Sequence, residues 1–498
     1  MFKNFIGYNI VANYHNRKKP SWLSSAIKIA IAVLVATLLW IAPQDFFGIP
    51  DLTITQQRVI AIFAFGALMW LMEAISAWTT SVLLIVLLLL TVSDSGLWFA
   101  MNSNGTQELG TLVSYKTLLA TFADPIIMLF LGGFILAIAT AKTGIDVTLA
   151  RAMLKPFGKR SEIVLLGFIL VTAIFSMFVS NTATAAMMLT FLAPVLKSLP
   201  VDGKGRIALA MAIPIGANIG GIGTPIGTPP NAIALRYLND PAGLNMNIGF
   251  GEWVAVMVPY VLVVLVISWV VLLKLFPFKQ KTIELQIEGE AKKDWHTTVV
   301  YITFAVTVLM WMADKYTGVN ANVVAMIPVA VFCVTGIIKR QDLEEINWSV
   351  LWMVAGGFAL GGAMNHSGLM TAMVNAIPFT SWSPLFIIIG SGLICIVLST
   401  FISNTATATL LVPILAAVSA GMGNALDPVG GVRTLLVGLA ISASLAMALP
   451  ISTPPNAMAH GTGLIQQSQM IKVGVIMGVV GMAIGYLYLI AIGTLNIW

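Results

Sequence analysis

The hexapeptide Ser-Asn-Thr-Ala-Thr-Ala occupies residues 180–185, and the same six letters return at residues 403–408. Two further motif pairs keep nearly the same spacing: Gly-Gly-Phe at 132–134 and 356–358, and Thr-Pro-Pro-Asn-Ala at 228–232 and 453–457. Three collinear matches at separations of 223 to 225 residues indicate that the chain holds two copies of one repeat. The polar motifs are the best-retained parts of two otherwise diverged halves.

Lipid is the expected solvent for most of this chain. It is 58% hydrophobic and 9% charged, whereas soluble globular proteins are about 25% charged. Runs of about 20 apolar residues recur from end to end, which predicts an all-α polytopic membrane protein. Cys333 and Cys395 form no disulfide framework or metal-ligand pattern. The net charge of +6 is attributed to basic cytoplasmic loops, so no nucleic-acid partner is expected. The polar, basic residues 1–25 do not read as a signal peptide.

The positions of Lys and Arg residues select a topology, because basic loops stay on the cytoplasmic side. With the N-terminus inside and residues 163–198 and 384–421 as re-entrant hairpins, 21 of the 26 basic residues fall inside. Two ordinary spans over 163–198 give nearly the same count, but each arm is short and a polar tip separates them. We expect about 11 transmembrane helices and two re-entrant hairpins, with the C-terminus outside.

These two hairpins enter from opposite sides of the membrane, so the halves are predicted to be inverted repeats. Inverted repeats are the architecture of many secondary transporters, whose site lies near the bilayer midplane. A duplication that merely enlarged a helix bundle would not retain polar motifs in preference to the rest. The expected segments are a cytoplasmic N-terminal segment (1–25), scaffold helices of the first half (26–162), a first hairpin and broken helix (163–276), a cytoplasmic linker (277–296), scaffold helices of the second half (297–382), and a second hairpin and broken helix (383–498).

Each Ser-Asn-Thr triplet is predicted to be the tip of a hairpin and the start of its second helix. Polar side chains in an apolar hairpin are costly unless they line a cavity or find partners, and serine and threonine start helices well. A helix start offers N–H donors and the positive end of the helix dipole to an oxyanion. Two such tips, Ser180–Thr182 and Ser403–Thr405, suit a substrate with two negative ends. A single copy would be better explained as a helix-packing patch.

The Thr-Pro-Pro-Asn motifs predict a broken helix in each half, because proline lacks an N–H and its ring clashes with the preceding turn. In the first half the motif follows a glycine-rich run, residues 216–227, which permits unwound backbone. Freed carbonyls, hydroxyls and amide oxygens can form an uncharged cage that suits Na⁺. Neither motif contains Lys, Arg, Asp or Glu, so bound cations are the expected counter-charge for an anion. One such break could be a simple kink, but two in register indicate a site.

The other polar residues within apolar runs are interpreted as structural. Asp124 is expected to cap the helix that follows it, and Glu73 to orient a loop or face the scaffold. His366 and His460 lie near the ends of spans and are expected to be structural rather than proton relays. The chain has no His-Glu-x-x-His pattern and no acid pair on facing helices, so an intramembrane enzyme is not expected. Broken helices in inverted halves also favour a transporter over a channel.

The paired motifs, together with Trp70-Leu71-Met72-Glu73-Ala74-Ile75, resemble those of the divalent anion/Na⁺ symporter (DASS) family, the INDY-type dicarboxylate and citrate carriers. The resemblance covers residues 55–495. It implies a homodimer in the bilayer, in which each protomer has a scaffold and a transport domain that moves as an elevator. The implied substrate contacts are Ser180, Asn181, Thr182, Ser403, Asn404, Thr405, Thr453 and Pro454. The implied Na⁺ ligands are Ser176, Ser180, Asn181 and Gly227 at one site and Ser399, Ile402, Asn404 and Ser452 at the other, so two or more ions are expected.

The leading functional prediction is Na⁺-coupled symport of a C4-dicarboxylate, such as succinate, malate or fumarate, across the cytoplasmic membrane. Ser176 and Ser399 are themselves 223 residues apart, which supports the two cation sites from within the sequence. A Na⁺-independent dicarboxylate exchanger and a symporter of sulfate or another divalent anion stay open as alternatives. Residues 75–78 read Ile-Ser-Ala-Trp where the family usually has prolines, a difference that concerns the scaffold more than the site.

Overall fold

The computed structural model of this chain consists of helices and their connections. It describes residues 22–97, 101, 107–197, 199–200, 203–241, 243–283, 294–376, 382–495 and 497–498. Within these ranges β-structure is confined to two isolated bridges, Ser93 with Val113 and Arg160 with Thr282. Ten of the described helices are long and apolar enough to cross a membrane. The prediction of an all-α polytopic protein is confirmed, whereas most of the predicted N-terminal segment and half of the charged linker lie outside the described residues.

The first half runs from α2 to α13. Its helices are α2 (Trp22–Ile41), α3 (Ile54–Met72), α4 (Ala77–Thr91), α6 (Tyr115–Ala120), α7 (Pro125–Thr143), α8 (Ile145–Leu154), α9 (Ser161–Phe178), α10 (Asn181–Lys197), α11 (Lys204–Gly220), α12 (Pro229–Leu238) and α13 (Phe250–Leu275). Asp124 caps α7, because its carboxylate accepts a hydrogen bond from Ile126 N at 2.9 Å. The predicted capping role of Asp124 is therefore confirmed.

The second half runs from α14 to α24. Its helices are α14 (Trp295–Met312), α15 (Asp314–Thr317), α16 (Ala321–Val324), α17 (Met326–Val334), α18 (Trp348–His366), α19 (Leu369–Ala376), α20 (Pro384–Phe401), α21 (Asn404–Met422), α22 (Gly431–Ser444), α23 (Pro454–Gly461) and α24 (Gln467–Thr494). The series α7 to α13 corresponds helix by helix to α18 to α24. The two halves therefore share this succession of seven helices.

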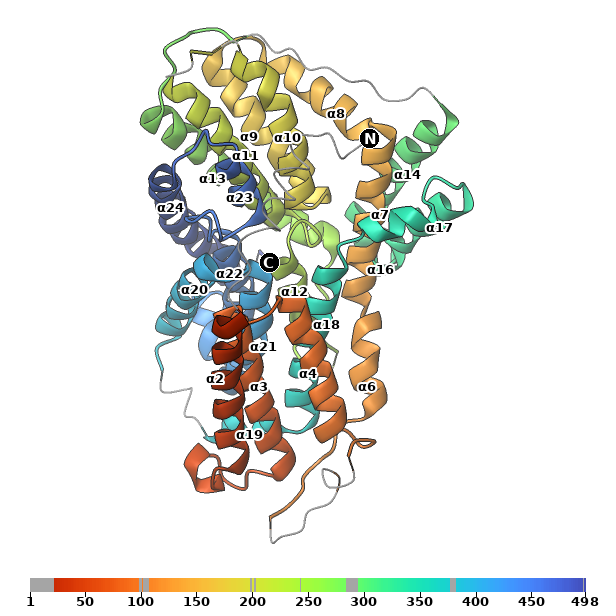
Figure 1. The fold of residues 1–498 in the computed structure, drawn as a ribbon, viewed down its shortest axis with the longest axis vertical. Coiled ribbons are helices and arrows are strands. Elements are labelled where there is room, and N and C mark those ends of the chain that lie inside the picture. The colour runs from red at the N-terminus through yellow and green to blue at the C-terminus, as the bar shows by residue number, and fades with distance from the viewer. Residues whose placement is uncertain are drawn as a thin grey trace.

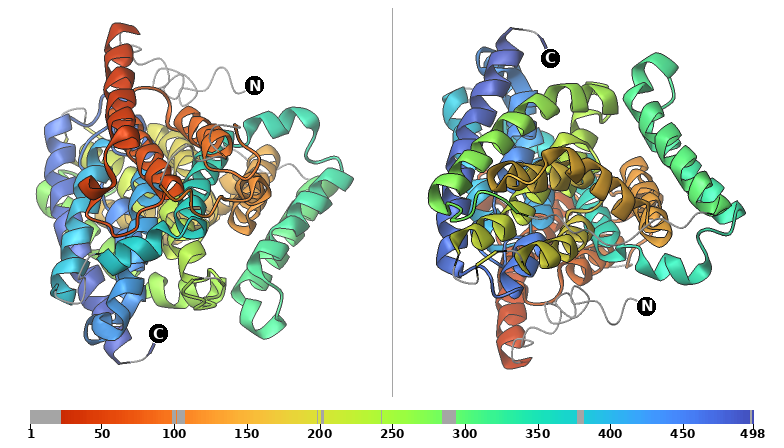
Figure 2. Two further views of the ribbon diagram at one scale, coloured as in Figure 1. Left: turned by 90° about the horizontal axis from the view of Figure 1, so that it is seen from below. Right: turned by 90° about the horizontal axis from the view of Figure 1, so that it is seen from above.

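The two hairpins lie in opposite parts of the molecule. In Figure 1 α9 and α10 stand in the upper half, whereas α20 and α21 stand in the lower half, and the broken helices α11–α12 and α22–α23 run between them. Figure 2 shows that α14 and α24 lie at opposite edges of the molecule. Hairpins that approach the centre from opposite ends agree with the predicted inverted repeat.

A pair of short helices, α8 and α19, was not foreseen from the hydropathy pattern. Each follows a long helix of its half directly, after a glycine in the left-handed region. Gly144 has φ 73° and Gly368 has φ 77°, and these two residues are 224 positions apart. Only glycine adopts such a conformation at little cost, so the duplicated turn is fixed by the duplicated glycine.

Replacing Gly368 with alanine should lower the stability of the protein by about 1–2 kcal/mol, because an L-residue is strained at this positive φ. Space is not the obstacle, since an added Cβ would come no closer than 3.4 Å to Gln56 Nε2. Thermal unfolding in detergent would show a lower apparent melting temperature for Gly368→Ala. Gly390→Ala, in open space on α20, is the control and should not lower it. Equal melting temperatures for the two variants would contradict the assignment.

Candidate functional site

Each Ser-Asn-Thr tip is the first turn of a helix. Ser180 lies directly before α10, and its hydroxyl oxygen accepts a hydrogen bond from Ala183 N at 3.3 Å. Ser403 is the N-cap of α21 and accepts from Ala406 N at 3.1 Å. A capping serine uses its oxygen as acceptor, so its hydroxyl hydrogen stays available as a donor. The prediction that a helix starts at each tip is confirmed.

A buried serine from the preceding helix turns back toward the first tip. Ser176 Oγ lies 2.5 Å from Asn181 Oδ1 and donates to the Ala217 carbonyl oxygen at 2.7 Å. Ala217 belongs to α11, and Gly227 follows in the unwound stretch before α12. These four residues, Ser176, Asn181, Ala217 and Gly227, form what we call the first serine cluster.

The Asn181 amide can be placed in two orientations, of which only the second satisfies its neighbours. In one, its oxygen lies beside Ser176 Oγ. In the other, its nitrogen donates to Gly227 O at 3.0 Å, to Ala217 O at 3.3 Å and to Ser176 Oγ at 2.5 Å. In both orientations a hydroxyl, an amide and two backbone carbonyls converge on one point, with no charged side chain among them.

The second half repeats the arrangement. Ser399 Oγ lies 2.7 Å from Asn404 Oδ1 and donates to the Ala443 carbonyl oxygen at 2.9 Å. Ser452 Oγ donates to the Thr400 carbonyl oxygen at 2.8 Å. We call Ser399, Asn404 and Ala443 the second serine cluster, to which Ser452 is joined through the backbone beside Ser399. The duplication in sequence is therefore also a duplication of hydrogen bonds.

The asparagine of each Thr-Pro-Pro-Asn motif holds its break together. Asn231 is fully buried, and its amide nitrogen donates to the carbonyls of Gly221, Ile222 and Thr224 at 3.0, 3.1 and 2.8 Å. Trp253 Nε1 of α13 donates to the same Ile222 carbonyl at 3.1 Å. Carbonyls freed by unwinding must find hydrogen-bond donors inside the protein. The Asn231 side chain is the donor for three of these carbonyls.

Asn456 has the same function in the second break. Its amide nitrogen donates to the carbonyls of Met447 and Leu449 at 2.6 and 3.1 Å. Thr453 caps α23, because its hydroxyl oxygen accepts from Asn456 N at 3.3 Å. Sequence reasoning counted amide oxygens among the possible Na⁺ ligands at the breaks and did not foresee that these two amide nitrogens bind the freed carbonyls. The signal was present, since a polar residue duplicated inside an apolar run needs a partner.

The two halves interlock at the site. Helix α10, which begins at the first tip, packs against α23, and α21, which begins at the second tip, packs against α12. Each tip helix therefore lies against the broken helix of the other half. The predicted substrate contacts on α10 and α23 thus come from packed helices of different halves.

The predicted site residues differ in accessibility. Ser176, Asn181 and Gly227 are brought together, as are Ser399 and Asn404, and buried Ile402 could offer only its backbone carbonyl. Among the predicted substrate contacts, Ser180, Asn181, Thr182, Ser403 and Asn404 are half-buried, Thr405 and Thr453 are buried, and Pro454 is exposed. Sequence reasoning missed the carbonyls of Ala217 and Ala443, because a backbone oxygen leaves no mark in the sequence.

The Gly-Gly-Phe motifs lie on α7 and α18, against the elements that carry the site. A Cβ on Gly357 would overlap Thr409 of α21, and one on Gly361 would overlap Tyr237 Oη of α12. On α7, the position of a Cβ on Gly133 is 3.8 Å from Ile226, in the first break. Gly357 therefore lets α18 approach the second tip helix closely, and Gly133 lies at ordinary van der Waals distance from the first break.

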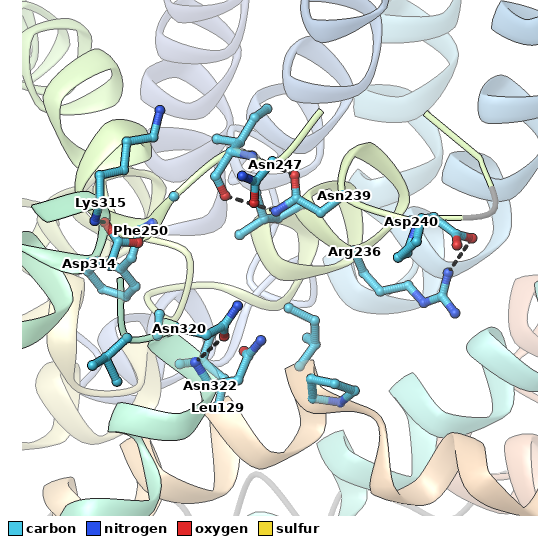
Figure 3. Close-up of a pocket in the computed structure, with 18 of the residues that line it drawn as sticks. Leu129, Arg236, Asn239, Asp240, Asn247, Phe250, Asp314, Lys315, Asn320 and Asn322 are labelled. Carbon is cyan, nitrogen blue, oxygen red and sulfur yellow. Dashed lines mark hydrogen bonds and ion pairs between the residues drawn. The ribbon is translucent and has the colours of Figure 1, made fainter. Parts of the chain in front are cut away.

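A cavity of about 780 Å³ lies beside the end of α12, between α7, α13 and the α14–α16 connection. Figure 3 shows Arg236 and Asp240 at one side of it and Asp314 and Lys315 at the other. Its charges are paired within the protein: Arg236 with Asp124 and Asp240 at 3.3 and 2.9 Å, Lys315 with Glu252 at 2.5 Å, and Asp314 with Phe250 N at 2.5 Å.

No predicted substrate or cation residue lines this cavity or a neighbouring one of about 420 Å³ that shares Arg236 and Asp240. Large volume therefore does not mark the predicted site. Because its cations already have carboxylate partners, the larger cavity lacks an uncompensated positive charge for a dianion. The serine clusters fit the predicted binding of Na⁺ and a dianion better than this cavity does, because of their hydrogen-bond geometry and not because of their size.

Comparison with known proteins agrees with this architecture. The model of the citrate transporter family (CitMHS) matches residues 67–432. The chain belongs to this family of transporters. It is 31% identical over 452 residues to an uncharacterized transporter of Haemophilus influenzae, covering 86% of this chain and 91% of that protein. It is 30% identical over 480 residues to the sodium-dependent dicarboxylate transporter SdcS of Staphylococcus aureus, covering 89% and 87%. The expectation of a multi-pass transporter related to DASS carriers, and not an enzyme, is confirmed.

Two solved structures share the fold. Neisseria gonorrhoeae MtrF, which represents a class of antimetabolite efflux pumps, has a TM-score of 0.52 at 14% identity and covers 84% of this chain and 94% of that chain. The YdaH transporter of Alcanivorax borkumensis has a TM-score of 0.53 at 12% identity and covers 84% and 98%. At such low identity the likeness concerns the fold alone.

Replacing Asn231 with aspartate should lower the apparent melting temperature by several degrees, because an acceptor would then face three carbonyls and each lost buried hydrogen bond costs about 1–3 kcal/mol. The change keeps the volume of the side chain, so packing is preserved. Asn365→Asp, at an exposed position near the end of α18, is the matched control and should melt within about 0.5 kcal/mol of the parent protein. If Asn231→Asp melted like the control, the assigned role of Asn231 would be wrong.

Proposed function

We propose that this transporter carries out Na⁺-coupled symport of C4-dicarboxylates through the site formed by the two tips and the two breaks. The observation that carries the proposal is the duplicated serine cluster. Each cluster is uncharged and rich in oxygen atoms, contains a fully buried serine and a half-buried asparagine, and adjoins a helix start. Na⁺ binds such sets of carbonyl, hydroxyl and amide oxygens at broken helices, and a carboxylate binds at helix starts.

The Asn181 amide supports Na⁺ in the first cluster. Without a bound cation, the amide nitrogen must face the carbonyls of Gly227 and Ala217, because these carbonyls are acceptors. A cation among the same carbonyls would reverse the preference and draw the amide oxygen inward. Ser180 and Gly227 complete the proposed ligand set of this site. Ser399, Ile402, Asn404 and Ser452 form the proposed set of the second site.

The absence of fixed charge supports cation coupling. No Lys, Arg, Asp or Glu occurs in residues 176–184, 216–232, 399–409 or 442–457. A dianion bound there gains hydrogen bonds from the Ser180–Thr182 and Ser403–Thr405 tips and from Thr453, with Pro454 beside it, but no side chain offsets its charge. Two or more Na⁺ ions would offset it. The name of the S. aureus relative, a sodium-dependent dicarboxylate transporter, supports the same substrate and ion.

We further propose that residues 163–276 and 383–498 move as an elevator against a scaffold of residues 26–162 and 297–382. The close glycine contacts of α18 with α12 and α21 support this division, because small residues let packed helices slide. The proposal also includes a homodimer in the cytoplasmic membrane with the N-terminus inside and the C-terminus outside. The distribution of basic residues supports this orientation.

Proteoliposomes test the coupling. Uptake of labelled succinate should require an inward Na⁺ gradient and should fall to background when choline replaces Na⁺. Excess unlabelled malate or fumarate should compete, whereas excess sulfate should not. Uptake that is equal in choline would overturn Na⁺ symport, and a requirement for internal succinate in its place would identify an exchanger. Competition by sulfate would broaden the substrate to divalent anions.

Removing one hydroxyl ligand should selectively weaken the binding of Na⁺. Ser176→Ala and Ser399→Ala should each raise the Na⁺ concentration for half-maximal uptake about tenfold, which corresponds to a loss of about 1.4 kcal/mol. Ser268→Ala is the control, since this buried serine of α13 donates within its own helix to the Val264 carbonyl. Unchanged Na⁺ dependence in both cluster variants would contradict the assigned cation sites.

The elevator makes a separate prediction. Gly357→Ala would place a methyl group against Thr409 Cγ2 and should slow succinate uptake about tenfold with little change in succinate affinity, because it hinders movement rather than binding. Adding Thr409→Ser, which removes that methyl group, should restore the rate. Gly362→Ala, in open space on the same helix, should transport normally. Failure of the double variant to recover would argue against sliding at this contact.

A further inference from the structure

Asn218 joins the two halves beside the site. It follows Ala217 on α11 and is 1% exposed. Its amide nitrogen donates to Thr453 Oγ1 at 3.2 Å and to Asn456 Oδ1 at 3.1 Å. These hydrogen bonds cross from the first half to the second. The Ala217 carbonyl, which belongs to the first serine cluster, is therefore in the peptide group that precedes Asn218, and the Asn218 side chain reaches the second break.

The bonds from Asn218 orient two groups of the second half. Thr453 Oγ1 accepts from Asn456 N as the cap of α23 and also from Asn218. With both acceptor positions of its oxygen used, the Thr453 hydroxyl hydrogen points away from these donors. Asn456, whose oxygen accepts from Asn218, holds the carbonyls of Met447 and Leu449 through its nitrogen. The amide of Asn218 thus sets the direction of a proposed substrate donor.

The orientation of the Asn218 amide depends on the second half alone. Its oxygen, Oδ1, is buried and has no hydrogen-bond partner within the described part of the chain. Both of the restraints on the amide therefore come from Thr453 and Asn456. A shift of either α11 or α23 would change these two bonds together, which is the property required of a connecting element.

The connection has no mirror image in the other half. Ala443 takes the place of Ala217 as the acceptor of its cluster serine, so Ser444 stands where Asn218 stands. Ser444 Oγ donates to the Ala440 carbonyl of its own helix at 2.9 Å. Asn231 Oδ1, the counterpart of Asn456 Oδ1, has no hydrogen-bond partner among the described residues. The connection therefore runs from the first serine cluster to the second break, and not in reverse.

We propose that Asn218 is a positioning residue that couples cation binding in the first serine cluster to substrate binding at Thr453. A cation held by the Ala217 carbonyl fixes the last turn of α11, which fixes Asn218 and, through it, the Thr453 hydroxyl. Linkage makes the coupling reciprocal, so that substrate also tightens cation binding. The proposal rests on the Na⁺-coupled function described above and adds the route by which one site reaches the other.

Binding measurements on the purified protein in detergent test the proposal. The dissociation constant of succinate is measured by calorimetry in choline and in saturating Na⁺, and the ratio of the two values is the coupling factor. In Asn218→Leu, whose side chain has a similar branched shape but no donor, this factor should fall about fivefold or more, toward one. Asn218→Ala serves in the same way if the leucine variant does not fold. Ser444→Ala, at the mirror position, should keep the parent coupling factor.

The outcomes separate this proposal from simpler ones. Weaker succinate binding by the same factor in both buffers would show that Asn218 is only structural and would overturn the proposal. In a Thr453→Ala background, Asn218→Leu should cause no further loss of coupling, because it acts through Thr453; a further full loss would also overturn it. If the parent protein bound succinate equally in choline and Na⁺, the proposed function itself would fail, and this inference with it.

Discussion

The structure depends on one constraint, which is that unwound backbone in the middle of a membrane protein must be hydrogen-bonded by the protein itself. Asn231 and Asn456 meet this constraint by donating to the carbonyls on the far side of each break. Without them the two helices would have to stay continuous or admit water. Because the break after α11 is held open, the Gly227 carbonyl reaches the same cluster as the Ala217 carbonyl, which closes the last turn of α11 and also accepts from Ser176.

Duplication of the repeat explains why the site has two similar serine clusters. Differences between the halves explain why the hydrogen bonds of Asn218 join them in one sense only. Ser176 and Ser399 lie in matching positions, where each is beside an asparagine amide and donates to a carbonyl of the broken helix. These contacts lie within one half in each cluster and do not by themselves join the two sites. Asn218 has no equivalent in the second half, so a change in one cluster can reach the other half by a route that has no counterpart.

Much of this arrangement could be predicted from sequence, because the signals were local and repeated. Proline and glycine located the breaks, serine located the helix starts at Ser180 and Ser403, and hydropathy located the spans. The carbonyls of Ala217 and Ala443 could not be predicted, since any residue supplies a backbone oxygen. The partners of Asn218 lie 235 and 238 residues away, and no local pattern encodes them. The turns at Gly144 and Gly368 carried a readable signal in their 224-residue spacing, which hydropathy alone does not detect.

The placement of charge explains why such a site would favour coupled transport. The ion pairs of Arg236 with Asp124 and Asp240, and of Lys142 with Asp342, include no residue of the serine clusters and are internally balanced. A fixed arginine at the midplane would attract a dicarboxylate, but it would stay charged after the substrate had left, and an unpaired charge there is costly. In the proposed mechanism the positive charge arrives with Na⁺ and departs with it. The empty site is then neutral and can return across the membrane without carrying an uncompensated charge. The lack of fixed positive charge makes the site bind the anion weakly by itself, and for the same reason binding of the anion depends on binding of the cation.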